Sequence, residues 1–236
     1  LSLHDALPIF SHAAVVVLDR SGSMSGSRLD AAKVSLSNLV NRLADDDVFG
    51  LIIFDNQAEV VVPADRVADL GRAGLSAAID AIHTGGSTDL SSGYLRGLQE
   101  ARRMCGDTGA TIIVLSDGMA NHGIVDAGRF REIATAAAAQ GITTSSIGIG
   151  VGYDDEILSE MAIGGTGNHT FAADGDAATA AYAALYDSET SAASNLRIAL
   201  KKLDVAVNAM GVSGSADLRA LWTQPAVHSL AIASRA

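Results

Sequence analysis

The chain has 236 residues, of which 48% are hydrophobic and only 4% are aromatic, so it can form one large domain with a mainly aliphatic core. Its formal net charge of −11 repels phosphate groups, which argues against binding of nucleic acid or of an anionic membrane surface. The single Cys105 excludes an intrachain disulfide framework, and no apolar run approaches the roughly 20 residues that span a bilayer.

The first residues do not read as part of a fold. Residues 1–11 begin without methionine, and the stretch "LSLHDALPI" resembles a translated sequencing adapter more than a protein segment. We therefore treat these residues as non-native and leave them out of the fold prediction. Any signal or anchor upstream would be invisible, so the compartment stays unknown, and the remaining chain is expected to contain a soluble domain.

Continuous apolar runs recur along the chain and predict strands at 13–18, 48–54, 110–115 and 142–150. Runs of this kind, without alternation, are typical of strands that are covered on both faces, and they favour a parallel sheet between two layers of helices. The segment 58–63 follows the second strand after a short turn. Because it contains Pro63, we expect it to be an antiparallel strand at the sheet edge.

Helical patterns lie between these strands, and they predict helices at 27–44, 65–82, 90–105, 126–139, 154–163 and 176–187. The alternation of strands and helices indicates a doubly wound α/β domain over residues 12–187. From residue 188 the pattern changes. The stretch "NLRIALKKLDVAVNAM" alternates like half-exposed strands, so 188–236 is expected to begin a β-rich segment whose patternless end is consistent with a truncated second domain.

Three loops of the predicted domain are rich in side-chain oxygen. Asp19, Ser21 and Ser23 occupy alternate positions after the first strand, so a turning backbone can bring them to one point. Thr88 precedes a predicted helix, and Asp117 follows a buried strand. Ligands of open α/β sheets bind at the carboxyl ends of the strands, so we expect these side chains to share one site.

Each loop by itself also has an ordinary explanation. Thr88 or Asp89 can cap the helix that begins at residue 90, and Asp117 with Gly118 is a common turn pair. Together the loops favour a common site with two carboxylates and three hydroxyls. Because neither thiol nor histidine stands at ligand spacing, such a site prefers Mg²⁺, with Mn²⁺ or Ca²⁺ as alternatives, over zinc or copper. Neutral hydroxyls leave the ion under-neutralised, so it should seek an anionic oxygen from outside.

The stretches "DRSGSM" and "LSDG", each after an apolar run, and "GGSTDL" together resemble the von Willebrand factor type A domain with its metal-ion-dependent adhesion site. The sequence "DRSGSM" is more similar to bacterial members than to integrin-type members, and the resemblance covers residues 13–187. It implies a Rossmann-like, mostly parallel six-stranded sheet with one antiparallel edge strand and helices on both faces. It also implies that the metal is held by Asp19, Ser21, Ser23, Thr88 and Asp117. At Gly85, Gly86 and Gly118 we expect the backbone either to pass close to the ion or to turn sharply.

The resemblance implies a protein-interaction module in which a Mg²⁺-type ion accepts an acidic residue of a protein partner, with neither catalytic residues nor an organic cofactor. The alternatives are a metal that is only structural, or a hydrolase that uses the metal or a serine nucleophile. Ser23, Asp117 and His122 could be proposed as a triad. However, "GSMSG" places Met24 where a nucleophile elbow needs serine, and His122 is more simply a residue of the loop rim.

Overall fold

The computed structural model describes residues 13–104, 109–150 and 152–173, together with the helical positions 177, 180, 181 and 184. The chain divides into two units, Leu1–Ser188 and Glu189–Ala236, and all the described residues lie in the first. Three predicted segments lie outside the described residues: the non-native start, most of the helix at 176–187 and the β-rich segment from 188. The predicted domain boundaries therefore remain predictions.

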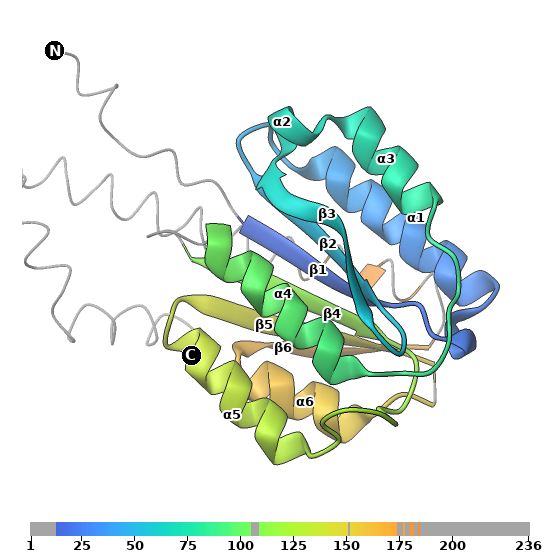
Figure 1. Cartoon of the computed structure of the whole chain (residues 1–236), viewed down its shortest axis with the longest axis vertical. Coiled ribbons are helices and arrows are strands. Elements are labelled where there is room, and N and C mark those ends of the chain that lie inside the picture. The colour runs from blue at the N-terminus through green and yellow to red at the C-terminus, as the bar shows by residue number, and fades with distance from the viewer. Residues whose placement is uncertain are drawn as a thin grey trace, which may run out of the picture. The chain divides into compact units, whose positions relative to one another are not determined.

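The described residues form one six-stranded sheet in the order β3-β2-β1-β4-β5-β6, in which only β3 runs antiparallel to its neighbour (Figure 1). This confirms the predicted fold. The strands are β1 (Ala13–Asp19), β2 (Val48–Phe54), β3 (Ala58–Arg66), β4 (Ala110–Ser116), β5 (Ile142–Ile149) and β6 (Thr166–Ala172). The helices are the short 3-10 turn η2 (Gly22–Met24), α1 (Ser27–Arg42), α2 (Val67–Leu70), α3 (Arg72–Asp80), α4 (Leu90–Met104), α5 (Ala127–Ala138) and α6 (Asp155–Gly164).

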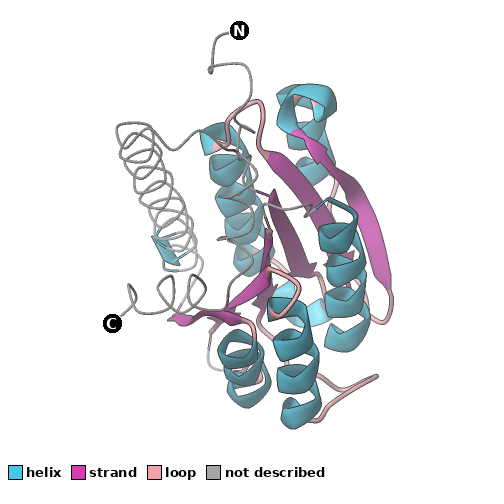
Figure 2. Ribbon diagram, turned by 90° about the vertical axis from the view of Figure 1, so that its left-hand side faces the viewer, coloured by secondary structure: helices cyan, strands magenta, loops and turns pink. Residues whose placement is uncertain are grey.

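Helices cover both faces of the sheet (Figure 2). On one face, Val16 and Leu18 of β1 belong to a core cluster with side chains of α1 and α3. On the other face, Val15 and Val17 belong to a cluster with side chains of α4, α5 and α6. Because successive residues point to opposite faces and both faces are covered, every residue of β1, β2 and β4 is buried. This explains why their sequences are continuous apolar runs.

The edge strand β3 behaves as its sequence predicts. It pairs antiparallel with β2, and its residues range from buried to exposed. Pro63 is exposed within it. Proline donates no backbone hydrogen bond, and an edge strand tolerates this because one of its sides has no partner strand. The strand is longer than the predicted 58–63 and continues to Arg66.

The prediction of one helix over 65–82 is wrong. Arg66 still belongs to β3, and the helical stretch is split into α2 and α3 at Gly71, whose φ is 72°. This left-handed backbone conformation interrupts the helix. The apolar spacing behind the prediction is nevertheless real, since Leu75 and Ile79 of α3 are buried in the core.

The strand β6 has no continuous apolar run in its sequence, and only the resemblance to a six-stranded family implied it. Its side chains are mostly half-buried or exposed, because β6 lies at the second edge of the sheet and pairs only with β5. A strand with a single paired neighbour and partial burial lacks the hydrophobic signal by which the central strands are recognised.

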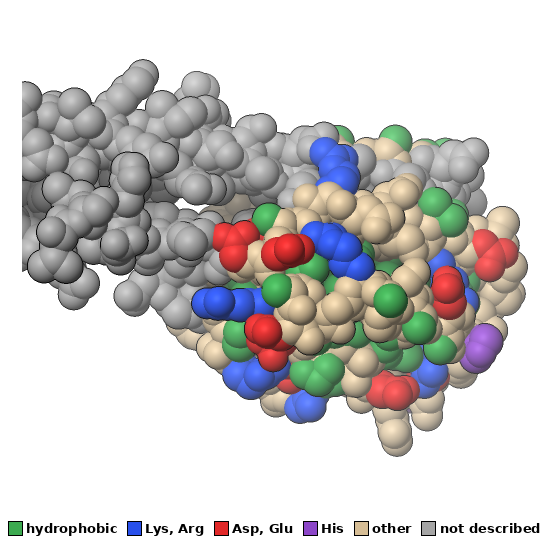
Figure 3. Space-filling view, turned by 90° about the horizontal axis from the view of Figure 1, so that it is seen from above, with side chains coloured by type: hydrophobic (Ala, Val, Ile, Leu, Met, Phe, Trp, Pro, Cys, Tyr) green, Lys and Arg blue, Asp and Glu red, His purple; other side chains and the backbone are tan. Residues whose placement is uncertain are grey.

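Acidic and basic side chains are interspersed on the face shown in Figure 3, so this face carries no large patch of one sign. In the described residues, no helix combines the length and the hydropathy that crossing a membrane requires.

Candidate metal centre

The candidate site lies at the carboxyl ends of the two central strands. The neighbours β1 and β4 run parallel, and from them the sheet continues in opposite directions, so this edge is the switch point at which open α/β sheets bind ligands. Asp19 is the last residue of β1, and Asp117 follows the last residue of β4. Thr88 lies in the loop between α3 and α4. The topology thus brings the three oxygen-rich loops to one edge.

A chain of hydrogen bonds joins four of the five predicted side chains. Asp19 Oδ1 accepts from the backbone nitrogen of Ser21 at 2.7 Å. The hydroxyl oxygens of Ser21 and Ser23 are 3.0 Å apart, and the Ser23 hydroxyl donates to Asp117 Oδ1 at 2.7 Å. The alternate spacing after β1 therefore does bring the Asp and the two Ser side chains to one point, as the sequence predicts.

Gly118 shows where these oxygens converge. A Cβ atom on Gly118 would lie 3.2 Å from Thr88 Oγ1, 3.3 Å from Ser23 Oγ and 3.7 Å from Asp19 Oδ2. Oxygens of the first loop and of the Thr88 loop thus surround one small space beside Gly118, and a Cβ there would press on two of them. The structure therefore brings all five predicted residues together, and Gly118 lies beside the oxygens of Thr88, Ser23 and Asp19.

Both carboxylates are removed from solvent. Asp19 is fully buried, and burial raises its pKa to about 6, although hydrogen bonds from Ser116 and Ser21 act in the opposite direction. Asp117 is 2% exposed. A buried carboxylate with only neutral hydrogen-bond donors, as at Asp19, gains strongly from a nearby cation because burial penalises its negative charge.

Several supporting residues have no clear signal in the sequence. The Ser116 hydroxyl donates to Asp19 Oδ2 at 2.6 Å, and its position directly before Asp117 is the only hint of that role. Asn121 Oδ1 accepts from the backbone nitrogen of Thr88 at 3.2 Å. Arg28 Nη1 lies 2.5 Å from Asp117 Oδ2, although 89 residues separate the two in the chain. No local pattern predicts a contact over that distance.

Of the two residues that could cap the N-terminus of α4, Thr88 and Asp89, the structure shows Asp89 in that role. Its Oδ1 accepts from the backbone nitrogen of Ser92 at 3.0 Å and from the Ser91 hydroxyl at 2.6 Å. Asp89 therefore caps the helix, while the Thr88 hydroxyl lies beside Gly118. The ordinary explanation applies to one of these two residues and not to the other.

Backbone hydrogen bonds hold the first two loops together. Gly22 N donates to Gly86 O at 2.9 Å, and Gly85 N donates to Arg20 O at 2.7 Å. A Cβ on Gly85 would overlap the carboxylate of Asp55, so this glycine is required by a protein contact. At Gly86 a Cβ would meet only Asn56 Oδ1, at 3.5 Å, an ordinary contact distance. The close approach of Gly85 and Gly86 to an ion stays a prediction.

The donor set of the site suits a hard cation. Among the described residues, no group of three or more His, Cys, Asp or Glu side chains could hold a metal ion. An ion at this edge would therefore depend on the three hydroxyls in addition to Asp19 and Asp117. Such all-oxygen ligation, with few charges, favours Mg²⁺ and related ions.

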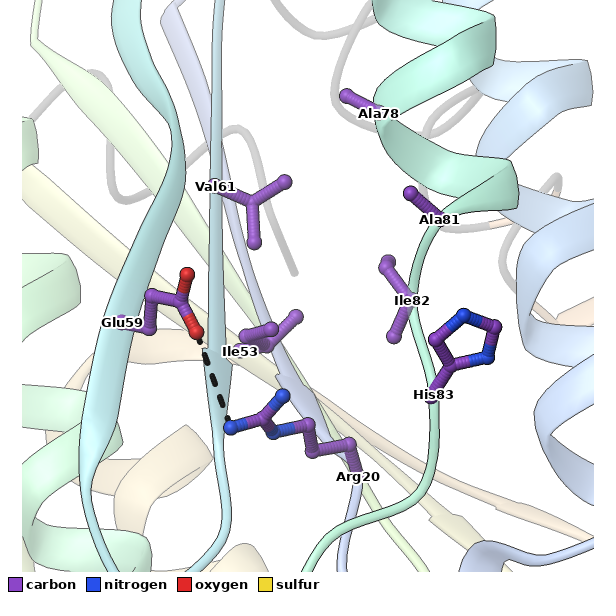
Figure 4. Close-up of a pocket in the computed structure, with 8 residues that line it drawn as sticks. All are labelled: Arg20, Ile53, Glu59, Val61, Ala78, Ala81, Ile82 and His83. Carbon is purple, nitrogen blue, oxygen red and sulfur yellow. Dashed lines mark ion pairs between the residues drawn. The ribbon is translucent and has the colours of Figure 1, made fainter.

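A separate hollow of about 170 Å³ lies beside the first loop (Figure 4). Mostly apolar side chains of β2, β3, α3 and the segment after α3 line it, together with His83, Glu59 and Arg20. Arg20 Nη2 lies 3.7 Å from Glu59 Oε2 and 3.2 Å from Asp55 Oδ2. None of the five predicted metal residues lines this hollow, so the hollow and the candidate centre are separate sites.

The predicted alternative of a Ser23–His122–Asp117 triad has little geometric support. A triad needs the serine hydroxyl to donate to the histidine. Here the Ser23 hydroxyl donates to Asp117, while His122 Nδ1 is paired with Asn121 Oδ1 at 2.7 Å. The contacts of Ser23 are those of an oxygen cluster.

A second serine, histidine and aspartate are hydrogen-bonded between β5, β6 and α6. Ser146 Oγ is 2.8 Å from His169 Nδ1, and His169 Nε2 is 3.1 Å from Asp155 Oδ1. However, Ser146 is fully buried and its hydroxyl donates to the carbonyl oxygen of Leu158. A nucleophile must be reachable by a substrate, so this group does not serve as one.

The comparisons with known proteins agree with this architecture. The family model of the von Willebrand factor type A domain matches residues 14–183. The uncharacterized protein sll0103 of Synechocystis sp. is 31% identical over 156 residues, which are 66% of this chain and 36% of that protein. The chain thus spans about a third of the length of this curated relative.

Solved structures show the same fold at low identity. The von Willebrand factor type A protein from Catenulispora acidiphila matches with a TM-score of 0.65 and 22% identity, over 73% of this chain and 41% of that one. Proximal thread matrix protein 1 from the mussel byssus, with a zinc occupied MIDAS motif, matches with a TM-score of 0.55 and 20% identity, over 70% of this chain and 42% of that one.

Proposed function

The chain belongs to the von Willebrand factor type A domain family, whose members are generally metal-dependent interaction modules, and from this premise we propose that it binds a protein partner through a divalent cation. The proposed ligands, direct or through water, are Asp19, Ser21, Ser23, Thr88 and Asp117. The observation that carries the proposal is the convergence of oxygens of Asp19, Ser23 and Thr88 beside Gly118, with Asp117 hydrogen-bonded to Ser23. The partner is proposed to offer a carboxylate.

The proposed ligands are of two kinds, neutral and charged. The hydroxyls of Ser21, Ser23 and Thr88 supply neutral oxygens, and Asp19 and Asp117 supply the negative charge. A bound divalent ion would offer a partner's acidic oxygen a position to coordinate. Ser23 is exposed, whereas Asp19, Ser21, Thr88 and Asp117 are buried, so the side of the site at Ser23 is the side that a partner reaches.

Mg²⁺ is the proposed ion, with Mn²⁺ and Ca²⁺ as alternatives, because all the proposed ligands are oxygens. Zinc belongs in the same titration, since the MIDAS motif of the mussel protein holds it. An enzymatic role is not proposed. The Ser23 hydroxyl donates its hydrogen bond to Asp117, and its contacts include no histidine that could act as the base of a triad.

Calorimetric titration with Mg²⁺, Mn²⁺, Ca²⁺ and Zn²⁺ tests the metal site. One site is expected in the wild type, with strongly reduced affinity in Asp19→Ala and in the double variant Ser21→Ala/Ser23→Ala, because each change removes proposed ligands. Ser25→Ala is the matched control, since Ser25 is an exposed serine of the same loop. Equal metal affinity in the wild type and the double variant would contradict the assignment of these residues as ligands.

Partner capture separates an interaction site from a structural metal. Thr88→Ala removes one neutral oxygen, so it should weaken Mg²⁺ binding modestly, preserve the fold and abolish capture of the partner. Acetate at high concentration should compete weakly with the partner, whereas acetamide should not. Capture that persists in EDTA and in Thr88→Ala would place the recognition surface elsewhere and leave the metal a structural role at most.

A further inference from the structure

Arg28 lies against the candidate centre, and neither the sequence pattern nor the proposed ligand set includes it. It is the second residue of α1. Its Nη1 is 2.5 Å from Asp117 Oδ2 and donates to the backbone oxygen of Ser23 at 3.3 Å. The Asp117 side chain is fully buried, while the Arg28 side chain is 40% exposed. The guanidinium therefore touches two residues of the centre and also reaches solvent.

The surroundings of Arg28 fix its position. A Cβ on Gly150, at the end of β5, would lie only 3.2 Å from Arg28 Nη2. The guanidinium thus packs over the ends of β4 and β5 as well as the first loop. This close approach to the backbone indicates a defined location, unlike that of a freely moving surface arginine.

Arg28 also divides the two oxygens of Asp117 between different neighbours. Oδ1 accepts from the Ser23 hydroxyl, on the side of the converging oxygens. Oδ2 is held by Arg28. Asp117 therefore has one oxygen available to an ion at the centre, either directly or through water, and the other is neutralised.

This arrangement has a consequence for the charge of the loaded site. The carboxylates of Asp19 and Asp117 together balance a divalent ion, and the proposed hydroxyl ligands are neutral. The guanidinium then leaves the loaded centre with a net positive charge. A nearby positive charge repels a cation and attracts an anion, and both effects are stronger next to a buried group than in water.

We propose that Arg28 is a positioning residue that sets the charge balance of the centre, so that cation binding is weaker and capture of an anionic carboxylate is stronger. The inference rests on the proposed function and assigns to Arg28 a part of the site's preference for an acidic partner. The other explanation of Arg28 is purely structural, as the counter-ion of a buried aspartate. The two explanations differ in sign, because loss of a structural support would weaken the binding of metal and of anion together.

The test compares wild type with Arg28→Gln, Arg28→Lys and a control, Arg129→Gln. Arg129 pairs with Glu132 on α5, and both side chains are 68% exposed. Mg²⁺ affinity is measured by calorimetry. Acetate is the anion probe, and its binding to the Mn²⁺-loaded protein is followed by the relaxation of its methyl protons.

We expect Arg28→Gln to bind Mg²⁺ about 3- to 10-fold more tightly and acetate about 3- to 10-fold more weakly than wild type, as removal of one nearby charge predicts. Arg28→Lys, which keeps the charge, should lie closer to wild type in both measurements. Arg129→Gln should match wild type. The metal-free Arg28→Gln protein should unfold at a lower temperature, and Mg²⁺ should raise that temperature more than in wild type, because the ion replaces the lost counter-charge of Asp117.

Parallel loss of Mg²⁺ and acetate affinity in Arg28→Gln would overturn the inference and leave Arg28 a structural role. If the metal-free variant does not fold, purification in Mg²⁺ and competition with a chelator give the same affinity ratio. A wild type that binds none of the divalent ions would overturn the proposed function, and the inference with it. A wild type that binds them while Arg28→Gln shows no opposite change overturns the inference alone.

Discussion

Asp19 is the residue at which metal binding and protonation should compete. Burial raises its pKa from 3.8 to about 6, and only the ionised form can ligate a cation. Mg²⁺ affinity should therefore increase as the pH rises from about 5 to about 7, as the carboxyl group loses its proton. Calorimetry across this range checks the prediction. An affinity that stays constant over the range would show that Asp19 does not bind the ion.

The same pKa predicts the pH dependence of stability in the metal-free protein. Because the folded-state pKa is raised, the contribution of Asp19 to stability is complete below its ordinary pKa of 3.8 and is lost as the pH rises through about 6. Asp19→Asn should remove this component of the pH dependence, as measured by chemical unfolding in EDTA. In saturating Mg²⁺ the trend of the wild type should reverse, because the ion stabilises the charged form.

Gly118 gives a test of the space at the centre. The methyl group of Gly118→Ala would stand 3.2 Å from Thr88 Oγ1 and 3.3 Å from Ser23 Oγ, so these oxygens must move apart. Mg²⁺ affinity should fall by about tenfold or more, which corresponds to about 1.4 kcal/mol. Gly74→Ala is the control, because a Cβ at Gly74 meets nothing within 4 Å. Undiminished metal affinity in Gly118→Ala would mean that the ion lies away from these oxygens.

At the scale of elements, α4 determines where the Thr88 loop ends, and two glycines allow this helix to approach the sheet. A Cβ on Gly93 would stand 2.5 Å from Phe54 Cδ1, and a Cβ on Gly97 would stand 2.5 Å from Val17 Cγ2. Contacts this short force the helix or the strands to shift. Small residues on this face of α4 are therefore part of what places its first turn at the metal edge.

Gly97→Ala should destabilise the fold by about 1–3 kcal/mol, because overpacking outweighs the helix propensity that alanine adds. Gly74→Ala in α3 should instead be neutral or stabilise by up to about 1 kcal/mol, since open space surrounds that position. Urea unfolding measures both. The double variant Gly97→Ala/Val17→Ala should lose less free energy of unfolding than the sum of the losses of the two single variants. Losses that simply add would contradict the proposed contact.

At the scale of the whole domain, the described fold does not depend on a metal for the hydrogen bonding of the two buried carboxylates at the candidate centre. Asp19 accepts from Ser21 and Ser116, and Asp117 accepts from Ser23 and Arg28, so each of the four carboxylate oxygens has a partner within the chain. This differs from small domains in which the metal itself supplies most of the folding energy.

EDTA should therefore leave the circular dichroism spectrum unchanged, whereas Mg²⁺ should raise the unfolding temperature through binding to the native state. At a concentration 100 times Kd this stabilisation is about 2.7 kcal/mol. The double variant Ser21→Ala/Ser23→Ala should lose the Mg²⁺-dependent increase while its metal-free protein keeps its secondary structure. Loss of helix signal on addition of EDTA to the wild type would contradict the prediction.

Much of the fold and the outline of the site were predictable from the sequence, because they depend on local patterns. The apolar runs of β1, β2 and β4 are covered on both faces, so burial leaves a continuous signal in the chain. The alternate spacing of Asp19, Ser21 and Ser23 limits how far apart these side chains can lie. The carboxyl end of a parallel strand also fixes the edge of the sheet to which Asp117 belongs.

The contacts between distant segments could not be predicted from the sequence. Arg28 meets Asp117 because α1 begins beside the end of β4, and that depends on the register between β1 and β4. The choice of Thr88 over Asp89 as the residue facing Gly118 follows from how α4 packs on the sheet. A local pattern records the surroundings that a residue shares with its chain neighbours, whereas these contacts join segments that meet only when the whole sheet has assembled.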